Sequence, residues 1–397
     1  MQHHNTLGWI SALSRPTIPT FAILFTLEPL ARSILITVIP LMVFERFGTV
    51  QNVSFFYFIL GISGVFMSLA IPWLVSKIDR RGIFNVGAVI GVVAMILFMQ
   101  GEIWSLCAGM ILHLFASSCI EVSLNLYMMR HIRRENFSFF EPIRVFFLAF
   151  SWSVGPFLGV YLRNAISLEA PFLFGVITTL VLTAYFFYLR FTDHLDTLTT
   201  RHSVTNPLKY LPRFFQQPRL RLAYFLSFMR SGWWTMYFIY VPIYCVTSGL
   251  GETFGGGLVS LATAFVMTTP LWRRPIHWLG MRTVLFIGFF CAGVMTIVIS
   301  LFMDNPYLAI GIIMAAAFFA VPCDAVGNAP FYRSVHSYER SEMTTVFVSY
   351  RSIASLTLPG LYSGVLAIFQ LPAVFAVTGM CMIGTSLVTR YIPKSMN

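Results

Sequence analysis

Apolar runs of about 20 residues, separated by short polar stretches, follow one another along almost the whole chain. A helix of that length spans the hydrocarbon core of a bilayer. Of the 397 residues, 57% are hydrophobic and only 10% are charged, which is too little charge to cover the surface of a water-soluble protein of this size. The sequence therefore predicts an all-α integral membrane protein.

We predict twelve transmembrane helices from these runs. Their ranges are 18–44, 51–75, 83–100, 103–128, 140–162, 168–190, 222–247, 253–270, 283–303, 306–331, 343–368 and 370–390.

The net charge of +11 follows from the predicted topology. With these spans, the Lys and Arg residues of loops and helix ends gather on one side, and the other side holds only Arg46 and Arg163. Because cytoplasmic loops carry the excess of cations, both termini are predicted to be cytoplasmic. The positive net charge is then explained by the topology and by contact with anionic lipid headgroups, and no nucleic-acid partner is needed to explain it.

Residue types that would support enzyme chemistry do not converge. The six cysteines all fall inside predicted spans without metal-ligand spacing, and of the eight histidines only His113 lies in a span. A membrane-embedded enzyme would need a nucleophile, base or metal set near an interface. No phosphate-binding loop is present either. We therefore expect no enzyme activity, no bound metal and no cofactor, so that a proton or ion gradient would supply the energy.

The chain divides into two similar halves. A polar stretch, residues 191–221, separates an N-terminal six-helix bundle at 1–190 from a C-terminal one at 222–397. When the sequence is aligned with itself at an offset of 203 residues, an acidic residue matches an acidic residue, an amide matches an amide and a basic residue matches a basic residue. These matches are Glu121 with Asp324, Asn125 with Asn328, and Arg130 with Arg333. We interpret them as an internal duplication.

Twelve helices, two similar halves and a basic central loop resemble the major facilitator superfamily. Between spans two and three, Asp79-Arg80-Arg81-Gly82 keeps part of that family's Gly-x-x-x-Asp-Arg-x-Gly-Arg-Arg element and lacks its first glycine and final arginines. The resemblance implies two pseudo-symmetric six-helix bundles, and it implies a gating role for Asp79, Arg80 and Gly82.

The fifth predicted span contains Gly155-Pro156-Phe-Leu-Gly159. This segment resembles the family's Gly-Pro-x-x-Gly element, which is associated with exporters that exchange solute for protons. Pro156 removes a backbone donor, and the glycines allow a neighbouring helix to approach closely. An ordinary kinked, tightly packed helix explains the same residues. The arginine of the family's fourth-span element is absent, and its place falls near Met110.

Seven ionisable residues lie well within predicted spans, where each costs about 3 kcal/mol if it faces lipid. They are Glu28, Arg32, Glu121, Arg144, Arg230, Asp324 and Arg351. Such residues must face the protein interior or water. Structural ion pairs would meet this requirement, and so would a solute pathway.

The resemblance implies that spans one, four, seven and ten line a central cavity, and these spans hold five of the seven charges. A carboxyl enclosed away from water can exchange protons near neutral pH. We nominate Glu28, Glu121 and Asp324 as proton or cation sites. For the substrate cavity we nominate Arg32, Asn125, Arg230, Trp233, Trp234, Tyr237, Tyr240 and Asn328. Arg32 and Arg230 are candidate counter-charges either for these acids or for a substrate carboxylate.

The sequence thus predicts a secondary transporter that exports a small organic or amphipathic solute in exchange for protons. It is expected to act as a monomer in a bacterial inner membrane. Two alternatives stay open: an uptake symporter for an organic acid, sugar or peptide, in which Arg230 would hold a carboxylate, and a solute sensor that has lost transport.

Overall fold

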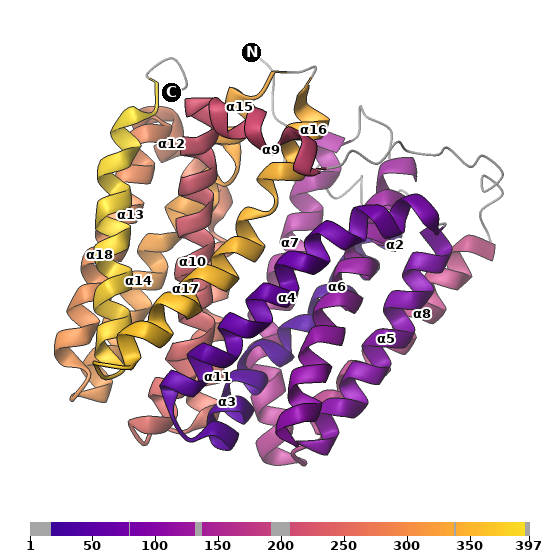
Figure 1. Cartoon of the computed structure of the whole chain (residues 1–397), viewed down its shortest axis with the longest axis horizontal. Helices are drawn as coiled ribbons and strands as arrows, with labels where there is room; N and C mark the ends of the chain where they lie inside the picture. The colour runs from indigo at the N-terminus through magenta and orange to yellow at the C-terminus, as the bar shows by residue number, and fades with distance from the viewer. Residues whose placement is uncertain (1–16, 79, 132–136, 192–206, 337–338, 394–397) are drawn as a thin grey trace. The chain divides into compact units, whose positions relative to one another are not determined.

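A computed structural model describes residues 17–78, 80–131, 137–191, 207–336 and 339–393, and over these residues it contains helices and no strand (Figure 1). The α-helices are α2 (Thr17–Ser33), α3 (Leu35–Phe47), α4 (Val50–Lys77), α5 (Arg80–Gln100), α6 (Ile103–His131), α7 (Phe137–Ala165), α8 (Ala170–Phe191), α9 (Pro207–Gln216), α10 (Pro218–Thr247), α11 (Glu252–Val266), α12 (Arg273–Leu279), α13 (Met281–Phe302), α14 (Pro306–Val326), α15 (Ala329–Ser334), α16 (Arg340–Phe347), α17 (Tyr350–Leu366) and α18 (Pro372–Val388). Two short 3₁₀ helices are η2 (Thr269–Trp272) and η4 (Thr389–Tyr391).

The helices bear out an all-α membrane protein. In the described part of the chain, 9 segments are long and apolar enough to cross a membrane, and a bent pair, α11 with η2 and α12, raises the number to 10. The sequence predicts two further spans. One falls on α10, a helix of 30 residues that carries several charged and aromatic side chains. The other falls on α16 together with α17, and α17 alone has 17 residues. The observed helices are therefore consistent with the predicted twelve.

The chain forms two compact units, and neither is one uninterrupted segment. The first contains residues 1–35 and 74–202, and the second contains 36–73 and 203–397, so that α4 begins in one unit and ends in the other. The division at the central polar stretch, 191–221, stays a prediction. Residues 36–73 belong with the second unit by their contacts.

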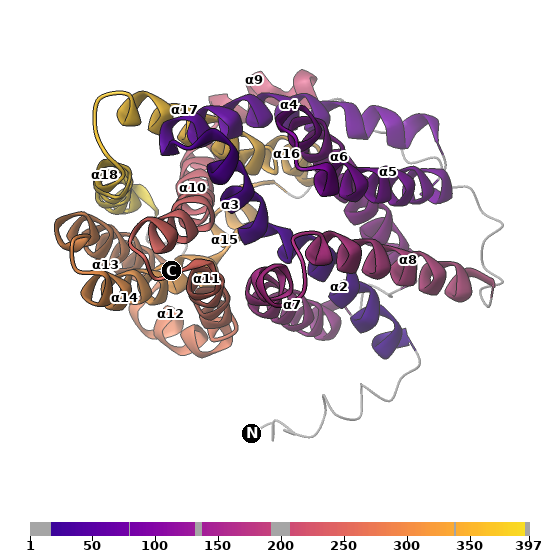
Figure 2. The same cartoon turned by 90° about the horizontal axis from the view of Figure 1, so that it is seen from below.

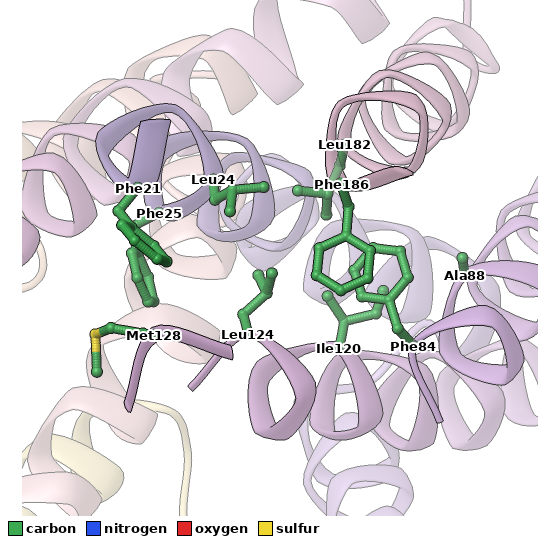
Figure 3. Packing of buried hydrophobic residues seen from close by; sticks show 10 residues of the cluster. All are labelled: Phe21, Leu24, Phe25, Phe84, Ala88, Ile120, Leu124, Met128, Leu182 and Phe186. Atoms are coloured by element: carbon green, nitrogen blue, oxygen red, sulfur yellow. The ribbon is translucent and has the colours of Figure 1, made fainter. Parts of the chain in front are cut away.

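The first unit is held together by an apolar core that α2, α5, α6 and α8 share (Figure 3). Phe84 and Phe186 stack within this core with ring centroids 4.0 Å apart. Its members are Phe21, Leu24, Phe25, Phe84, Ala88, Ile120, Leu124, Met128, Leu182 and Phe186. The core lies on the same helices that carry Glu28, Arg32 and Glu121, so packing fixes the positions of these charges.

The first predicted span is interrupted at Ile34, between α2 and α3. Gly155 and Gly159 of α7 face this interruption. A Cβ on Gly155 would collide with the Ser33 hydroxyl, and a Cβ on Gly159 would collide with the Ile34 carbonyl oxygen. The Ser33 hydroxyl also donates a hydrogen bond of 2.9 Å to the Ser151 carbonyl oxygen. The glycines of the Gly-Pro-x-x-Gly segment therefore permit close contact between α7 and the end of α2.

Gly159→Ala should therefore destabilise the protein by about 1–3 kcal/mol, since the added methyl group meets backbone that cannot move aside. The measurement is thermal unfolding of the purified protein in detergent. Gly364→Ala in α17 is the matched control, because a Cβ there has no neighbour within 4 Å. Equal unfolding temperatures for the two variants would contradict this reading.

The second unit contains two packed groups of helices. In one, α13 lies against both α14 and α18 (Figure 2). In the other, α10 packs on α11 and α17. A second apolar core, which includes Phe214, Phe331 and Phe347, joins α9 and the first turns of α10 to α15 and α16. Beside it, Arg213 of α9 forms an ion pair with the buried Glu339.

Residues 36–73 join the second unit through close backbone contact and a buried hydrogen bond. The hydroxyl groups of Ser54 in α4 and Tyr240 in α10 lie 2.6 Å apart. A Cβ on Gly61 would collide with the backbone of Leu356 in α17. Small residues at this crossing let α4 and α17 touch, as is usual where membrane helices pack without a hydrophobic driving force.

The tenth predicted span is also interrupted. Gly327, with a φ of +57°, separates α14 from α15, and the helix resumes at Ala329. A positive φ is a conformation that glycine adopts without steric cost. The interruption exposes the last carbonyl groups of α14, which makes them available to a side-chain donor from another helix.

Candidate functional site

In the first unit, a single guanidinium lies between two carboxylates from different helices. The Nε atom of Arg32 lies 2.8 Å from Oε1 of Glu28. Its Nη2 donates a 3.1 Å hydrogen bond to Oε2 of Glu28, and its Nη1 donates a 3.0 Å hydrogen bond to Oε2 of Glu121. Glu28 and Arg32 are one turn apart on α2, whereas Glu121 comes from α6. The structure thus brings together three of the predicted residues as one cluster.

These three side chains differ in their access to solvent. The exposed fraction is 6% for Glu28, 23% for Arg32 and 39% for Glu121. Taking a carboxylate out of water is costly unless a cation compensates it, so Glu28 depends on Arg32 far more than Glu121 does. A change in the charge of Glu28 would therefore have the larger effect on the position of Arg32.

A small cavity with a few polar groups in a mostly apolar wall adjoins this cluster. It has a volume of about 20 Å³ and is bounded by α2, α5, α6 and α8. Glu28, Arg32, His113 and Ser117 contribute polar groups to its wall. The remaining wall is Ala31, Gly91, Met95, Ala116, Ile120, Thr179 and Leu182.

In the second unit, Arg230 of α10 lies at the interruption between α14 and α15. Its Nε is 3.6 Å from Oδ1 of Asp324, and Nη1 donates a 3.3 Å hydrogen bond to the carbonyl oxygen of Cys323. Nη2 donates to Oδ1 of Asn328 at 3.0 Å and to the hydroxyl of Tyr350 at 3.3 Å. The guanidinium therefore satisfies the exposed end of α14 as well as its carboxylate.

Asp324 has a second partner. The indole Nε1 of Trp234 donates a 2.8 Å hydrogen bond to its Oδ2. The side chains of Arg230 and Asp324 are both mostly buried. Ion pair, amide and indole form a connected network, and such networks hold their members in fixed positions when every member is satisfied.

The two ion pairs occupy related places in the predicted repeat. Glu121 and Asp324 are 203 residues apart and each pairs with an arginine of the first helix of its own half. The arginines themselves are not equivalent, because Arg230 corresponds to Glu28 at an offset of 202 and Arg32 lies one turn farther along. In both predicted halves an acidic residue of the fourth helix therefore pairs with an arginine of the first, although the two arginines stand at different positions along their helices.

Three nominated aromatic residues of α10, Trp233, Tyr237 and Tyr240, are fully buried within the second unit. The indole of Trp233 donates a 3.0 Å hydrogen bond to the Thr296 hydroxyl, and Tyr240 contacts Ser54 as described above. These contacts give the aromatic rings a structural role. Their role in binding a solute stays a prediction.

The remaining nominated residues are placed as follows. Asp79 lies outside the described residues, and α5 begins at Arg80, with Gly82 half-buried in its first turn. Asn125 is half-buried on α6, and Pro156 is buried on α7. Their gating and binding roles stay predictions.

Of the two other charges in predicted spans, Arg144 lies 5.4 Å from the ring of Phe25. The Nε of Arg351 donates a 3.3 Å hydrogen bond to the hydroxyl of Tyr350.

An open groove of about 470 Å³ lies between α4 and α17. Its wall is Phe55, Phe58, Leu356, Thr357, Gly360 and Ser363. None of the nominated residues lines this groove, so it is separate from both charge clusters.

The polar wall residues His113 and Ser117, and Tyr350 as a partner of Arg230, were not predicted from the sequence. A signal for the wall does exist, because His113, Ser117 and Glu121 follow one another at intervals of four on α6. That spacing places them on one helix face and could have linked His113 to the charge cluster. Tyr350 carries no comparable signal, because it lies far from Arg230 in the chain.

Comparison with known proteins supports the fold. The profile of the Major Facilitator Superfamily matches residues 21–359. No curated protein sequence matches the chain. A solved peptide transporter, POT, in complex with sulfate is similar in structure with a TM-score of 0.78 at 11% identity, covering 96% of this chain and 94% of that one. A nucleoside transporter, NupG, has a TM-score of 0.70 at 14% identity and covers 95% and 99%.

These likenesses to solved structures, all at low identity, bear on the fold alone. The match of the family profile extends over most of the sequence and takes in both charge clusters. The chain therefore belongs to the Major Facilitator Superfamily and is a transporter rather than an enzyme.

Proposed function

We propose that the protein is a proton-coupled secondary transporter that exports a small organic or amphipathic solute by alternating access. The observation that supports this proposal is the buried Glu28, which shares Arg32 with the more exposed Glu121. When Glu28 is protonated and therefore neutral, Arg32 keeps Glu121 as its one negatively charged partner in this cluster. The cluster therefore has two charge states with different internal contacts, as a coupling site requires.

The solute would act on the same equilibrium. A ligand shifts a two-state protein only by its difference in affinity for the two states. Protonation of Glu28 changes the contacts of Arg32, and in this way it can favour one state of the carrier over the other. Glu121 and Asp324 are the further candidates for coupling, and Asn125, Asn328 and the aromatic residues of α10 remain candidates for solute contact.

Export is proposed on the resemblance of Gly155-Pro156-Phe-Leu-Gly159 to the element found in exporters. The alternative is uptake with a carboxylate held by Arg230, which is compatible with the folds of the peptide and nucleoside transporters. In the structure, the guanidinium of Arg230 is already engaged by Asp324, Asn328 and two further groups. A substrate carboxylate would have to displace them, which favours the exporter.

The protein is proposed to act as a monomer in a bacterial inner membrane with both termini cytoplasmic. The experiment uses proteoliposomes that contain a pH-sensitive dye, to which dialanine, uridine, 5-aminolevulinic acid or ethidium is added outside. Solute entry by exchange makes the lumen more alkaline, whereas entry by symport acidifies it. The sign of the pH change therefore separates antiport from symport whichever way the protein is inserted.

Alkalinisation with any of these probes supports the proposal. Acidification would establish the symporter instead. A probe that binds, as measured by tryptophan fluorescence, but crosses in no condition would identify the protein as a sensor.

A further inference from the structure

The cavity beside Glu28 has room for one small molecule. A water molecule needs roughly 10–15 Å³ of such space, and the cavity measures about 20 Å³. Glu28 and His113 lie on different helices, α2 and α6, and both line it. A water in this space would be within reach of both side chains.

The chemistry of the wall selects water over a metal cation. Arg32 lies in the wall, and its guanidinium repels a cation from a space this small. Water can accept a hydrogen bond from Arg32 or His113 and donate one to the carboxylate of Glu28. The hydroxyl of Thr179, also in the wall, already donates to the Gly175 carbonyl oxygen at 2.8 Å and so offers only an acceptor. The site thus has the two to four polar partners that a buried water requires.

We propose that this cavity holds one bridging water and that His113 exchanges protons with Glu28 through it. This inference rests on the proposed proton coupling at Glu28. In the step, the neutral imidazole of the half-buried His113 takes a proton from solvent water on one ring nitrogen as its other ring nitrogen gives its proton to the bridging water. The bridging water gives one of its own protons to a carboxylate oxygen of Glu28. The products are neutral imidazole, water and a carboxylic acid, and the reverse step returns the proton. Nothing is oxidised or reduced.

The charged groups around this step come from two of the four helices. On α2 they are Glu28 and Arg32, and on α6 they are His113 itself and Glu121, two turns farther along. The cavity wall from α5 is Gly91 and Met95, and that from α8 is Thr179 and Leu182. None of these four side chains titrates, so protons pass between α6 and α2. His113 is accordingly a proton-relay residue, and Glu28 is the coupling site.

Gly91 provides a way to remove the water without removing any titratable group. A Cβ at this position would lie 3.6 Å from the Cβ of Ala116 and 4.0 Å from Cγ2 of Thr179, which are ordinary contacts. A methyl group takes up about as much space as one water, so Gly91→Ala should fill the cavity without straining the helices. Gly384→Ala in α18 is the matched control, because a Cβ there has no neighbour within 4 Å.

The test follows protonation of Glu28 directly and needs no solute. The full-length protein in liposomes is subjected to a rapid fall in pH, and the infrared band of the protonated carboxyl is recorded against time. The part of the signal that disappears in Glu28→Gln belongs to Glu28. Both His113→Gln and Gly91→Ala should slow the growth of this band roughly tenfold or more, and Gly384→Ala should leave the rate unchanged.

The outcomes separate this inference from the proposed function. Wild-type rates in both His113→Gln and Gly91→Ala, with the Glu28 band intact, would overturn the relay and leave coupling at Glu28 standing. A wild-type protein without any pH-dependent Glu28 band would overturn the coupling site itself. If His113→Gln does not fold, Gly91→Ala still decides, because that variant keeps the imidazole.

Discussion

The Glu28→Gln variant is expected to lose proton-coupled transport while remaining folded. Glutamine has nearly the shape of glutamate and its side-chain oxygen can still accept a hydrogen bond from Arg32, but it cannot take up a proton. In proteoliposomes, proton movement driven by a solute gradient should fall at least about 100-fold, whereas exchange of labelled for unlabelled solute should continue. The measurements are luminal pH and isotope exchange with the probe that the solute survey identifies.

Glu102→Gln is the matched control, since Glu102 is an exposed carboxylate at the start of α6. It should transport as the wild type does. If Glu28→Gln also moves protons at the wild-type rate, Glu28 is not the coupling residue, and Glu121 and Asp324 become the next candidates.

Removal of the Arg230 guanidinium should be among the most destabilising single changes in the second unit. Arg230→Met keeps the apolar stem and leaves the buried Asp324 with Trp234 as its remaining partner described above. Loss of one member of a buried ion pair costs about 3–5 kcal/mol, because the remaining charge stays out of water. Equilibrium unfolding in mixed detergent should show this loss.

Arg230→Met combined with Asp324→Asn should recover much of that stability, because the double variant leaves no buried charge behind. Arg221→Met serves as the control, since Arg221 is an exposed arginine on the same helix α10 and its removal should cost little. A double variant as unstable as the sum of the two single variants would show that the pair is not what stabilises this region.

The parts of the fold that depend on composition could be predicted from the sequence, and so could contacts between near neighbours. Apolar run length specifies helices that cross a membrane, and Glu28 with Arg32 is readable because residues four apart share a helix face. The repeat identified Glu121 and Asp324 as related positions. Arg32 and Arg230 were predicted as counter-charges for the acids, but the sequence did not show which acid each would pair with, because the two arginines stand at different positions along their helices and long-range pairing depends on packing.

The helix interruptions were also beyond prediction. The range 18–44 reads as one apolar run, since nothing at Ile34 distinguishes it from its neighbours, and the interruption becomes intelligible only from the close approach of Gly155 and Gly159. Gly327 with Asn328 is recognisable from the sequence as a pair that ends a helix. That this helix end accepts hydrogen bonds from Arg230 depends on the position of α10. Local signals mark where a helix can end, and tertiary contact decides whether it does.

The two serine hydrogen bonds that tie α2 to α7 have a mechanical consequence. Ser33 bonds to the backbone of Ser151, and the Ser151 hydroxyl in turn donates a 2.8 Å bond to the carbonyl oxygen of Thr26. Sliding one helix along the other would break both links within a water-poor interior. The segment of α2 that contains Glu28 and Arg32 should therefore move with α7 as one rigid body. Any bending during a transport cycle then occurs at other positions along the chain.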